Sequence, residues 1–367
     1  MGSNVGNRLN YIQKAVDLIY TTIGDVVNIS SIYQTPAWGF SSDDFYNACI
    51  TLNTFYAASE VLEQLLIIEN QLGRNRTEVN GYEARTIDLD IIFSSEGVIQ
   101  TEQLKIPHPF MQDRKFVLSP LSEIAKNHEH PVLKRTVSQL LKASADTSKI
   151  EKLKDRIVNP KEKYNLSKTQ YLTIEGNIGA GKTSLANLIA QEFNAKLVLE
   201  RFADNPFLPK FYENMERYAF PLEMSFLADR YHRLQDDIAQ LDLFKDFVVS
   251  DYDVYKSLIF AQVTLQEDEF ALYQKVFDIM YKDLPKPGLY VYLYQNTARL
   301  LENIKKRGRD YEQKIPAIYL DKINKGYLQF IKLHTNHAVK IIDISDKDFV
   351  NVREDYLWVL DQIVSSY

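Results

Sequence analysis

The sequence predicts two domains of different kinds, of which the second is an α/β domain built on a parallel sheet. The chain has 367 residues, which is enough for two hydrophobic cores. Between residues 140 and 170 it is rich in Lys, Ser and Asp and has few large apolar side chains after Leu153, a composition typical of a linker. Beyond that stretch, short apolar runs alternate with longer segments of helical spacing, as in domains where helices cover a parallel sheet.

Composition excludes several classes of protein. Hydrophobic residues make up 45% of the chain and charged residues 25%, and the net charge of -6 gives no footprint for nucleic acid or an anionic membrane surface. The single cysteine, Cys49, rules out an intrachain disulfide and favours a reducing compartment. There is no signal-peptide pattern and no apolar run near the roughly 20 residues of a membrane helix. We therefore expect a cytoplasmic protein with neither a nucleic-acid nor a membrane partner.

Each strand of the second domain is predicted from a run rich in β-branched and aromatic residues. Helical spacing such as that of TSLANLIAQEF, residues 183–193, separates the runs. The expected sheet is therefore parallel and five-stranded. Its strands fall in the runs YLTIEG (171–176), KLVLER (196–201), FVVSDY (247–252), LYVYLY (289–294) and VKIIDIS (339–345).

A phosphate-loop pattern lies between the first of these runs and the helix that follows it. GNIGAGKT, residues 176–183, fits G-x-x-x-x-G-K-[ST]. Backbone N–H groups of such a loop point at phosphate oxygens, Lys182 adds charge at the outer phosphates, and Thr183 is suited to hold Mg²⁺. The alternative is a glycine-rich turn that binds nothing. The residues expected to bind ATP here are Gly176, Asn177, Gly179, Ala180, Gly181, Lys182, Thr183 and Ser184.

Residues 169–367 resemble the deoxynucleoside kinases, through IEGNIGAGKTSL, LER, FYENMERYAFPLEMSFLADRYHRL and KKRGRDYEQKIPAIYLDKI. The resemblance implies that Glu200 is the base for a 5′-hydroxyl; the alternative is a solvated charge at a strand end. Lys182, with Arg307 and Arg309 of a lid, would complete the catalytic set. KKRGR is also compatible with a basic helix end. Tyr212 and Glu312 would hold the sugar, and Arg230 would read the base.

Three positions depart from that family. Where the family usually carries an arginine after the third strand, this chain has Tyr252. Ser257 stands where an acidic partner of the base-reading arginine is common, and Glu223 stands in place of a base-pairing glutamine. An ionised glutamate only accepts hydrogen bonds, so we expect a base with an amino group, adenine or cytosine, and poor use of thymidine. Between these two bases, the resemblance to kinases fused to the pterin enzyme implies deoxyadenosine.

In the first half, IDLDII is predicted to be a strand that carries Asp88 and Asp90 on one face. With no local cation between them, two such carboxylates favour Mg²⁺; the alternative is that both face water at a sheet edge. His108, between two prolines, is by itself more typical of a structural loop residue. The arginines at 74, 76, 85 and 114 nevertheless make a polyphosphate site plausible.

Residues 2–143 resemble the 6-hydroxymethyl-7,8-dihydropterin pyrophosphokinases, through SSIYQTPAWG, DDFYNACITL, RTIDLDII and IPHPFMQDRKFVLSPL. The resemblance implies a ferredoxin-like α+β fold that transfers pyrophosphate from ATP to a pterin alcohol, with Mg²⁺ bound by Asp88 and Asp90. Stacking and amide pairing suit the flat pterin ring. The ATP set would be Glu69, Arg74, Arg76, Arg85, His108 and Arg114, with Arg74 and Arg85 catalytic, and the pterin set Thr35, Trp38, Phe45, Asn47 and Phe116.

The opening MGSNVG is turn chemistry that follows a first strand in that family, so we expect this strand to be missing here. The predicted organisation is a pyrophosphokinase domain over 1–143, a linker over 144–168 and a deoxynucleoside kinase domain over 169–367. The alternative is that only one domain is catalytic and the other is a nucleotide-binding regulatory or structural module. The expected partners are ATP, the pterin alcohol and a deoxynucleoside, and the resemblance allows a homodimer through the kinase domain.

Overall fold

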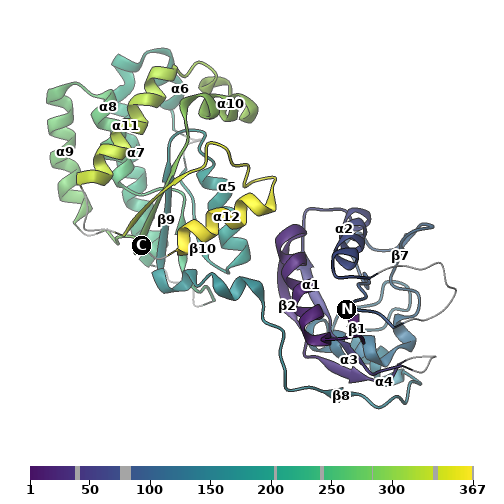
Figure 1. Cartoon of the computed structure of the whole chain (residues 1–367). Helices are drawn as coiled ribbons and strands as arrows, with labels where there is room; N and C mark the ends of the chain where they lie inside the picture. The colour runs from purple at the N-terminus through teal and green to yellow at the C-terminus, as the bar shows by residue number, and fades with distance from the viewer. Residues whose placement is uncertain are drawn as a thin grey trace. The chain divides into compact units, whose positions relative to one another are not determined.

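The computed structural model describes residues 1–37, 42–74, 84–201, 205–239, 244–282, 284–333 and 338–365. The chain forms two compact units, Met1–Lys163 and Tyr164–Tyr367, which are coloured purple to teal and teal to yellow in Figure 1. The division between them falls inside the segment expected to be a linker. In the described parts of the chain, no helix is long and apolar enough to cross a membrane.

The second unit is built on a five-stranded sheet in which all neighbouring strands are parallel. This confirms the sheet predicted from the apolar runs. β9 lies at the centre, and all six of its residues are buried, as expected for a parallel strand covered on both faces. In spatial order the strands are β10 (Lys196–Val198), β11 (Val248–Ser250), β9 (Tyr171–Gly176), β12 (Leu289–Tyr294) and β13 (Val339–Asp343).

Helices cover both faces of this sheet. In Figure 1, α7, α8, α9 and α11 lie on one side of β9, while α5 and α12 lie on the other. The helices are α5 (Lys182–Glu192), α6 (Leu208–Glu213), α7 (Met215–Ala239), α8 (Tyr255–Thr264), α9 (Glu267–Tyr281), α10 (Thr297–Arg307), α11 (Ala317–Leu333) and α12 (Arg353–Val364). The short 3-10 segments η3 (Leu166–Thr169) and η4 (Asp310–Glu312) complete the unit.

Glycine sets the turn from β9 into α5. Gly181, the residue before the helix, has φ +82°, a left-handed conformation that side chains disfavour. A Cβ at this position would also lie 2.8 Å from Cζ of Phe349. The sequence therefore requires glycine here for the loop to close onto the first turn of α5, where Lys182 and Thr183 lie.

The first unit holds small antiparallel sheets and four α-helices in its described part. A four-stranded sheet has the order β1 (Gly2–Ser3), β4 (Phe45–Asn47), β3 (Tyr33–Thr35) and β8 (Glu151–Lys152). Two further pairs are β2 (Asp25–Ile29) with β5 (Ile50–Asn53), and β6 (Ile99–Gln100) with β7 (Lys105–Ile106). The helical segments are α1 (Arg8–Thr22), α2 (Ala58–Gln71), η1 (Met111–Asp113), α3 (Lys115–Ile124), α4 (Val137–Ala143) and η2 (Pro160–Lys163).

Two expectations for this unit differ from the structure. IDLDII was expected to form a strand. Instead, its backbone forms an isolated bridge between Gly2 and Asp88, with N···O distances of 2.9 and 2.7 Å, and the oxygen of Ile92 accepts a bond from the N–H of His108 at 3.1 Å. That prediction was wrong, although Ile87 and Leu89 are buried on one side and the two aspartates lie on the other. The residues read as an opening turn form β1, which pairs with β4. The ferredoxin-like arrangement stays a prediction.

Candidate nucleotide and acceptor sites

The phosphate loop is anchored to two helices by asparagine side chains. Asn177 donates through Nδ2 to the backbone oxygen of Leu320 and to Oδ1 of Asn324 in α11, both at 2.8 Å. Asn303 of α10 donates through Nδ2 to the backbone oxygen of Gly179 at 2.9 Å. These bonds fix the loop against both helices, and the N–H groups of Gly179 and Gly181 are among those that would form the cradle that the sequence predicts.

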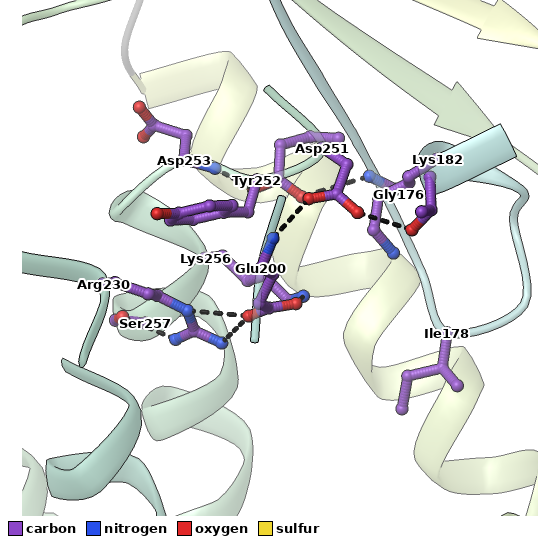
Figure 2. A network of polar contacts seen from close by, with 12 residues as sticks. Gly176, Ile178, Lys182, Glu200, Arg230, Asp251, Tyr252, Asp253, Lys256 and Ser257 are labelled. Carbon is purple, nitrogen blue, oxygen red and sulfur yellow. Dashed lines mark hydrogen bonds and ion pairs between the residues drawn. The ribbon is translucent and has the colours of Figure 1, made fainter. Parts of the chain in front are cut away.

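Glu200 lies two residues beyond β10, and its carboxylate is held from both sides by cations (Figure 2). Arg230 of α7 donates from Nε at 2.9 Å and from Nη2 at 2.6 Å to the same oxygen, Oε1. Lys256 of α8 donates to the other oxygen, Oε2, at 2.5 Å. The structure therefore brings together two of the predicted residues, Glu200 and Arg230, with a lysine that sequence reasoning missed.

This arrangement keeps Glu200 ionised. Burial alone would raise the pKa of the carboxyl, but the charges and hydrogen bonds of Lys256 and Arg230 outweigh burial and hold the pKa at about 2. The alternative of a solvated strand-end charge does not describe this side chain, which is about nine-tenths covered. A buried carboxylate between two cations is oriented as well as charged, which suits a group that must receive a proton from one direction.

Asp251, the first residue after β11, connects this carboxylate to the phosphate loop. Its Oδ1 accepts a hydrogen bond from the backbone N–H of Glu200 at 2.7 Å, and its Oδ2 accepts one from the Thr183 hydroxyl at 2.5 Å. The Thr183 hydroxyl is a hard oxygen ligand at the start of α5, and it fits the chemistry of Mg²⁺. The sequence shows the acidic residue after the third strand, but only the fold shows what it contacts.

The residues expected to read the base lie around Arg230. Its Nη1 donates to Oγ of Ser257 at 2.6 Å, so the serine is a partner of this arginine even though it carries no charge. Glu223 is 2% exposed; Oε1 accepts a weak bond from Thr264 at 3.3 Å, and Oε2 has no hydrogen-bond partner among the described residues. Burial raises the pKa of Glu223 to about 7, against the opposing charge of Arg230.

The predicted sugar and lid residues also meet. Glu312 is 5% exposed, and it forms ion pairs with Arg307 and, at 3.2 Å, with Arg309. The ring of Tyr212 stacks on that of Tyr311, with centroids 6.1 Å apart. Burial, followed by the charge of Glu312, raises the pKa of the Tyr212 phenol. Thus the two arginines expected to contact phosphate touch the carboxylate expected to hold the sugar.

The first unit contains a cavity of about 330 Å³ that collects most of its predicted site residues. Inside it, Asn47 donates through Nδ2 to the hydroxyl of Thr35 at 2.9 Å, a contact that orients the amide beside Phe45. The predicted residues that line the cavity are Thr35, Phe45, Asn47, Arg74, Arg85, Asp88, Asp90, His108, Arg114 and Phe116. The cavity is therefore aromatic and amide-lined as well as strongly charged.

Asp88 has cationic neighbours, contrary to the expectation that no local cation pairs with it. Arg74 approaches Oδ1 at 2.5 Å and Arg85 approaches Oδ2 at 2.7 Å. Burial favours the neutral acid, yet Arg85 and Arg74 hold the pKa of Asp88 below its usual range. Arg74 also pairs with the buried Glu69, which accepts from the backbone N–H of Leu89 at 2.8 Å. Fourteen positions separate Arg74 from Asp88, so that pair could not be seen in the sequence, whereas Arg85 lies only three positions away and could have been considered.

Two predicted residues, Trp38 and Arg76, lie outside the described residues. Within the described ranges, no three His, Cys, Asp or Glu side chains gather closely enough to hold a metal ion by themselves. Asp88 and Asp90 nevertheless line one cavity and offer carboxylate oxygens, the ligand type that Mg²⁺ takes in nucleotide sites together with phosphate oxygens.

The parallel sheet, the phosphate loop and the clamped carboxylate define a nucleotide-dependent phosphoryl transferase in the second unit. Comparison with known proteins identifies the families. Residues 172–366 match the model of the deoxynucleoside kinases, and residues 1–126 match that of 7,8-dihydro-6-hydroxymethylpterin-pyrophosphokinase. The chain belongs to both families, one in each unit.

Individual relatives agree with this division. Over 190 residues the chain is 38% identical to the deoxyguanosine kinase of Bacillus subtilis, covering 51% of this chain and 92% of that one. It is 28% identical over 214 residues to the deoxyadenosine/deoxycytidine kinase of the same organism, covering 56% and 96%. Over 140 residues it is 35% identical to the 2-amino-4-hydroxy-6-hydroxymethyldihydropteridine pyrophosphokinase of Aquifex aeolicus, covering 38% and 86%. The chain is therefore a fusion of two ATP-dependent transferases.

Proposed function

We propose that the second unit transfers the γ-phosphoryl group of ATP to the 5′-hydroxyl of a purine deoxynucleoside, and that the first transfers pyrophosphate from ATP to 6-hydroxymethyl-7,8-dihydropterin. The observation that carries the first half is the clamped carboxylate of Glu200, tied through Asp251 to the phosphate loop. Membership of the two families supports both halves.

In the kinase reaction the nucleoside oxygen forms a bond to the γ-phosphorus while the bond from that phosphorus to the bridging oxygen of ADP breaks. ADP leaves with the electron pair, and Glu200 receives the proton of the hydroxyl. With a pKa of about 2 in the ligand-free site, Glu200 is a weak base. It orients the hydroxyl first and takes the proton late, which fits a loose phosphoryl-transfer transition state.

The protein's other groups position the nucleotide. The N–H groups of residues 176–184 and the ammonium group of Lys182 hold the phosphates, and Thr183 would hold Mg²⁺, which neutralises phosphate charge when it is bound. The guanidinium groups of Arg307 and Arg309 are paired with Glu312 in this structure, close to where a sugar hydroxyl would bind. We expect a substrate hydroxyl to replace one of those contacts and turn an arginine toward phosphate.

The identity of the base depends on Glu223. The family resemblance favoured deoxyadenosine, and the deoxyadenosine/deoxycytidine kinase relative supports that candidate. A buried glutamate with an unbound Oε2 fits deoxyguanosine better once it is ionised, because guanine offers two adjacent N–H donors, at N1 and at its amino group. Protonated, the same side chain donates and accepts, which fits adenine. The 38% identity to a deoxyguanosine kinase also favours guanine near neutral pH.

In the first unit the cavity is suited to a pterin beside a polyphosphate. Phe45 and Phe116 offer aromatic faces, and the Asn47 amide can pair with the ring edge. Arg74, Arg85, Arg114 and His108 would hold ATP, and Asp88 and Asp90 would hold Mg²⁺, which neutralises phosphate charge when it is bound. The pterin hydroxyl oxygen forms a bond to the β-phosphorus while the bond from that phosphorus to the oxygen shared with the α-phosphate breaks. AMP leaves with the electron pair, and the hydroxyl proton passes to water.

One experiment tests both halves. The purified chain is incubated with ATP and Mg²⁺, with the pterin alcohol or with each of the four deoxynucleosides, and the nucleotide product is identified. Pterin-dependent AMP and purine-dependent ADP are the expected results. If only one of the two products forms, the unit expected to make the other product is a nucleotide-binding or structural module, which is the alternative that the sequence left open.

A further inference from the structure

The chain has no arginine at the second position after β11, where the deoxynucleoside kinase pattern carries one. Tyr252 takes this position, and its side chain is fully buried in an apolar cluster that includes Val254 and Phe277. A tyrosine at that place supplies no positive charge to the site. The reaction nevertheless builds negative charge on the transferring group, so another cation has to act there.

Lys256 lies four residues further along, in the first turn of α8, and points back into the site (Figure 2). It is 7% exposed, which is rare for a lysine without a specific partner. Its Nζ lies 2.5 Å from Oε2 of Glu200, on the side of the carboxylate opposite Arg230.

Lys256 retains capacity to bind a further group. An ammonium group has three N–H donors, and among the described residues only Glu200 accepts one of them. Its charge also reaches the phosphate loop: after burial, Lys256 is the largest cause that lowers the pKa of Lys182, to about 8. Two lysines, one on α5 and one on α8, thus face the same phosphate-binding space.

We propose that Lys256 performs the task of the missing arginine: it positions Glu200 for the 5′-hydroxyl and donates to an oxygen of the phosphoryl group in transit. This role rests on the proposed kinase activity of the second unit. No atom is transferred to or from Lys256; it remains an ammonium ion while the γ-phosphoryl group passes from ATP to the nucleoside oxygen and ADP leaves.

The test compares three variants of the full chain by ADP formation with the best deoxynucleoside. Lys256→Met keeps the length of the side chain without its charge, and kcat should fall about 100-fold or more, because the charge acts mainly in the transition state. The KM for the deoxynucleoside should change by less than about threefold, since the base and sugar contacts remain. Lys256→Arg should restore kcat to within about tenfold of the unmutated chain.

Lys275→Met is the matched control, because it removes the same charge from the exposed surface of α9. It should leave kcat unchanged. Folding of the Lys256 variants is checked by nucleoside binding in calorimetry and by their AMP-forming activity with the pterin alcohol. If Lys256→Met fails to fold, Lys256→Gln serves as the neutral variant with the same expected loss.

The outcomes are distinguishable. If the unmutated chain forms ADP and Lys256→Met has an unchanged kcat, only the role of Lys256 is overturned. The same conclusion follows if Lys256→Arg is as slow as Lys256→Met. Absence of ADP with every deoxynucleoside in the unmutated chain overturns the proposed kinase activity and this role together. A loss of kcat that arginine restores, at constant KM, supports the role.

Discussion

Arg230 binds a single carboxylate oxygen of Glu200 with two of its nitrogens, at 2.9 and 2.6 Å, and uses its third nitrogen on Ser257. Arg230, the residue expected to read the base, therefore also holds the group expected to take a proton. A nucleoside that contacts Arg230 would also adjust the position of Glu200. Recognition and chemistry share one side chain in this site.

The first prediction concerns Glu200. Glu200→Gln keeps the shape of the side chain but cannot accept the hydroxyl proton, so kcat for ADP formation should fall about 10²-fold to 10⁴-fold. Binding of ATP, measured by calorimetry, should persist because the phosphate loop is intact. Glu216→Gln, an exposed change in the first turn of α7, is the control. A Glu200→Gln variant with near-normal kcat would show that this carboxylate is not the base.

The second prediction concerns Asp88 and Asp90. Either substitution to Asn removes a metal-binding charge, and pterin-dependent AMP formation should fall at least about 100-fold while ADP formation continues. For Asp88→Asn, Arg74 and Arg85 also lose their ion pairs with the Asp88 carboxylate, so ATP binding without Mg²⁺ should tighten. Asp17→Asn on α1 is the surface control. Wild-type AMP release in both variants would remove the metal assignment.

The third prediction is a purine preference that changes with pH. Because the pKa of Glu223 is raised to about 7, the ionised fraction of this side chain should increase between pH 6 and 8. The charges of Arg230, Lys256 and Glu200 also act on this carboxyl. The ratio of kcat/KM for deoxyguanosine to that for deoxyadenosine should rise over this interval. Glu223→Gln should make the ratio independent of pH and lower it. A constant ratio in the unmutated chain would contradict the role of Glu223 in base selection.

The fourth prediction is a stability change from the same carboxyl. The folded pKa of about 7 lies above the ordinary value of 4.5, so the folded state prefers the protonated form. Its stabilising contribution is complete below pH 4.5 and is lost as pH rises through 7. Relative to Glu223→Gln, the free energy of unfolding should fall by on the order of 3 kcal/mol over that window. Calorimetry of the ligand-free chain measures this change. The unfolding transition of the second unit is first identified as the one that an added deoxynucleoside shifts.

Local patterns were enough to predict the parallel sheet and the phosphate loop. Each strand of the second unit is an apolar run between helical segments, and a loop such as 176–183 encodes its function in consecutive residues. Glu200 was located differently, through the resemblance to the deoxynucleoside kinases, at the end of the run that the sequence predicts as the second strand.

Long-range proximity was not predictable in the same way. Lys256 is 56 positions from Glu200, and nothing in DYDVYKS shows that a lysine turns inward there. Likewise, the pairing of Asp88 with Arg74 depends on how a helix end meets an extended segment. The strand expected over IDLDII failed because alternation fixes which side chains share a face but not whether the backbone finds a partner.

The asparagine anchors of the phosphate loop have a consequence for the arginine segment between α10 and α11. Asn303 fixes the end of α10 to this loop, and Asn177 fixes the start of α11 to it. The segment between the two helices, with Arg309 and Glu312, is short, and both of its ends belong to helices that are anchored to the phosphate loop. The loss of conformational entropy that closing it requires is incurred when the unit folds, before any nucleotide arrives. We expect binding to order side chains rather than backbone in this segment, so less of the nucleotide's interaction free energy is consumed in assembling the site.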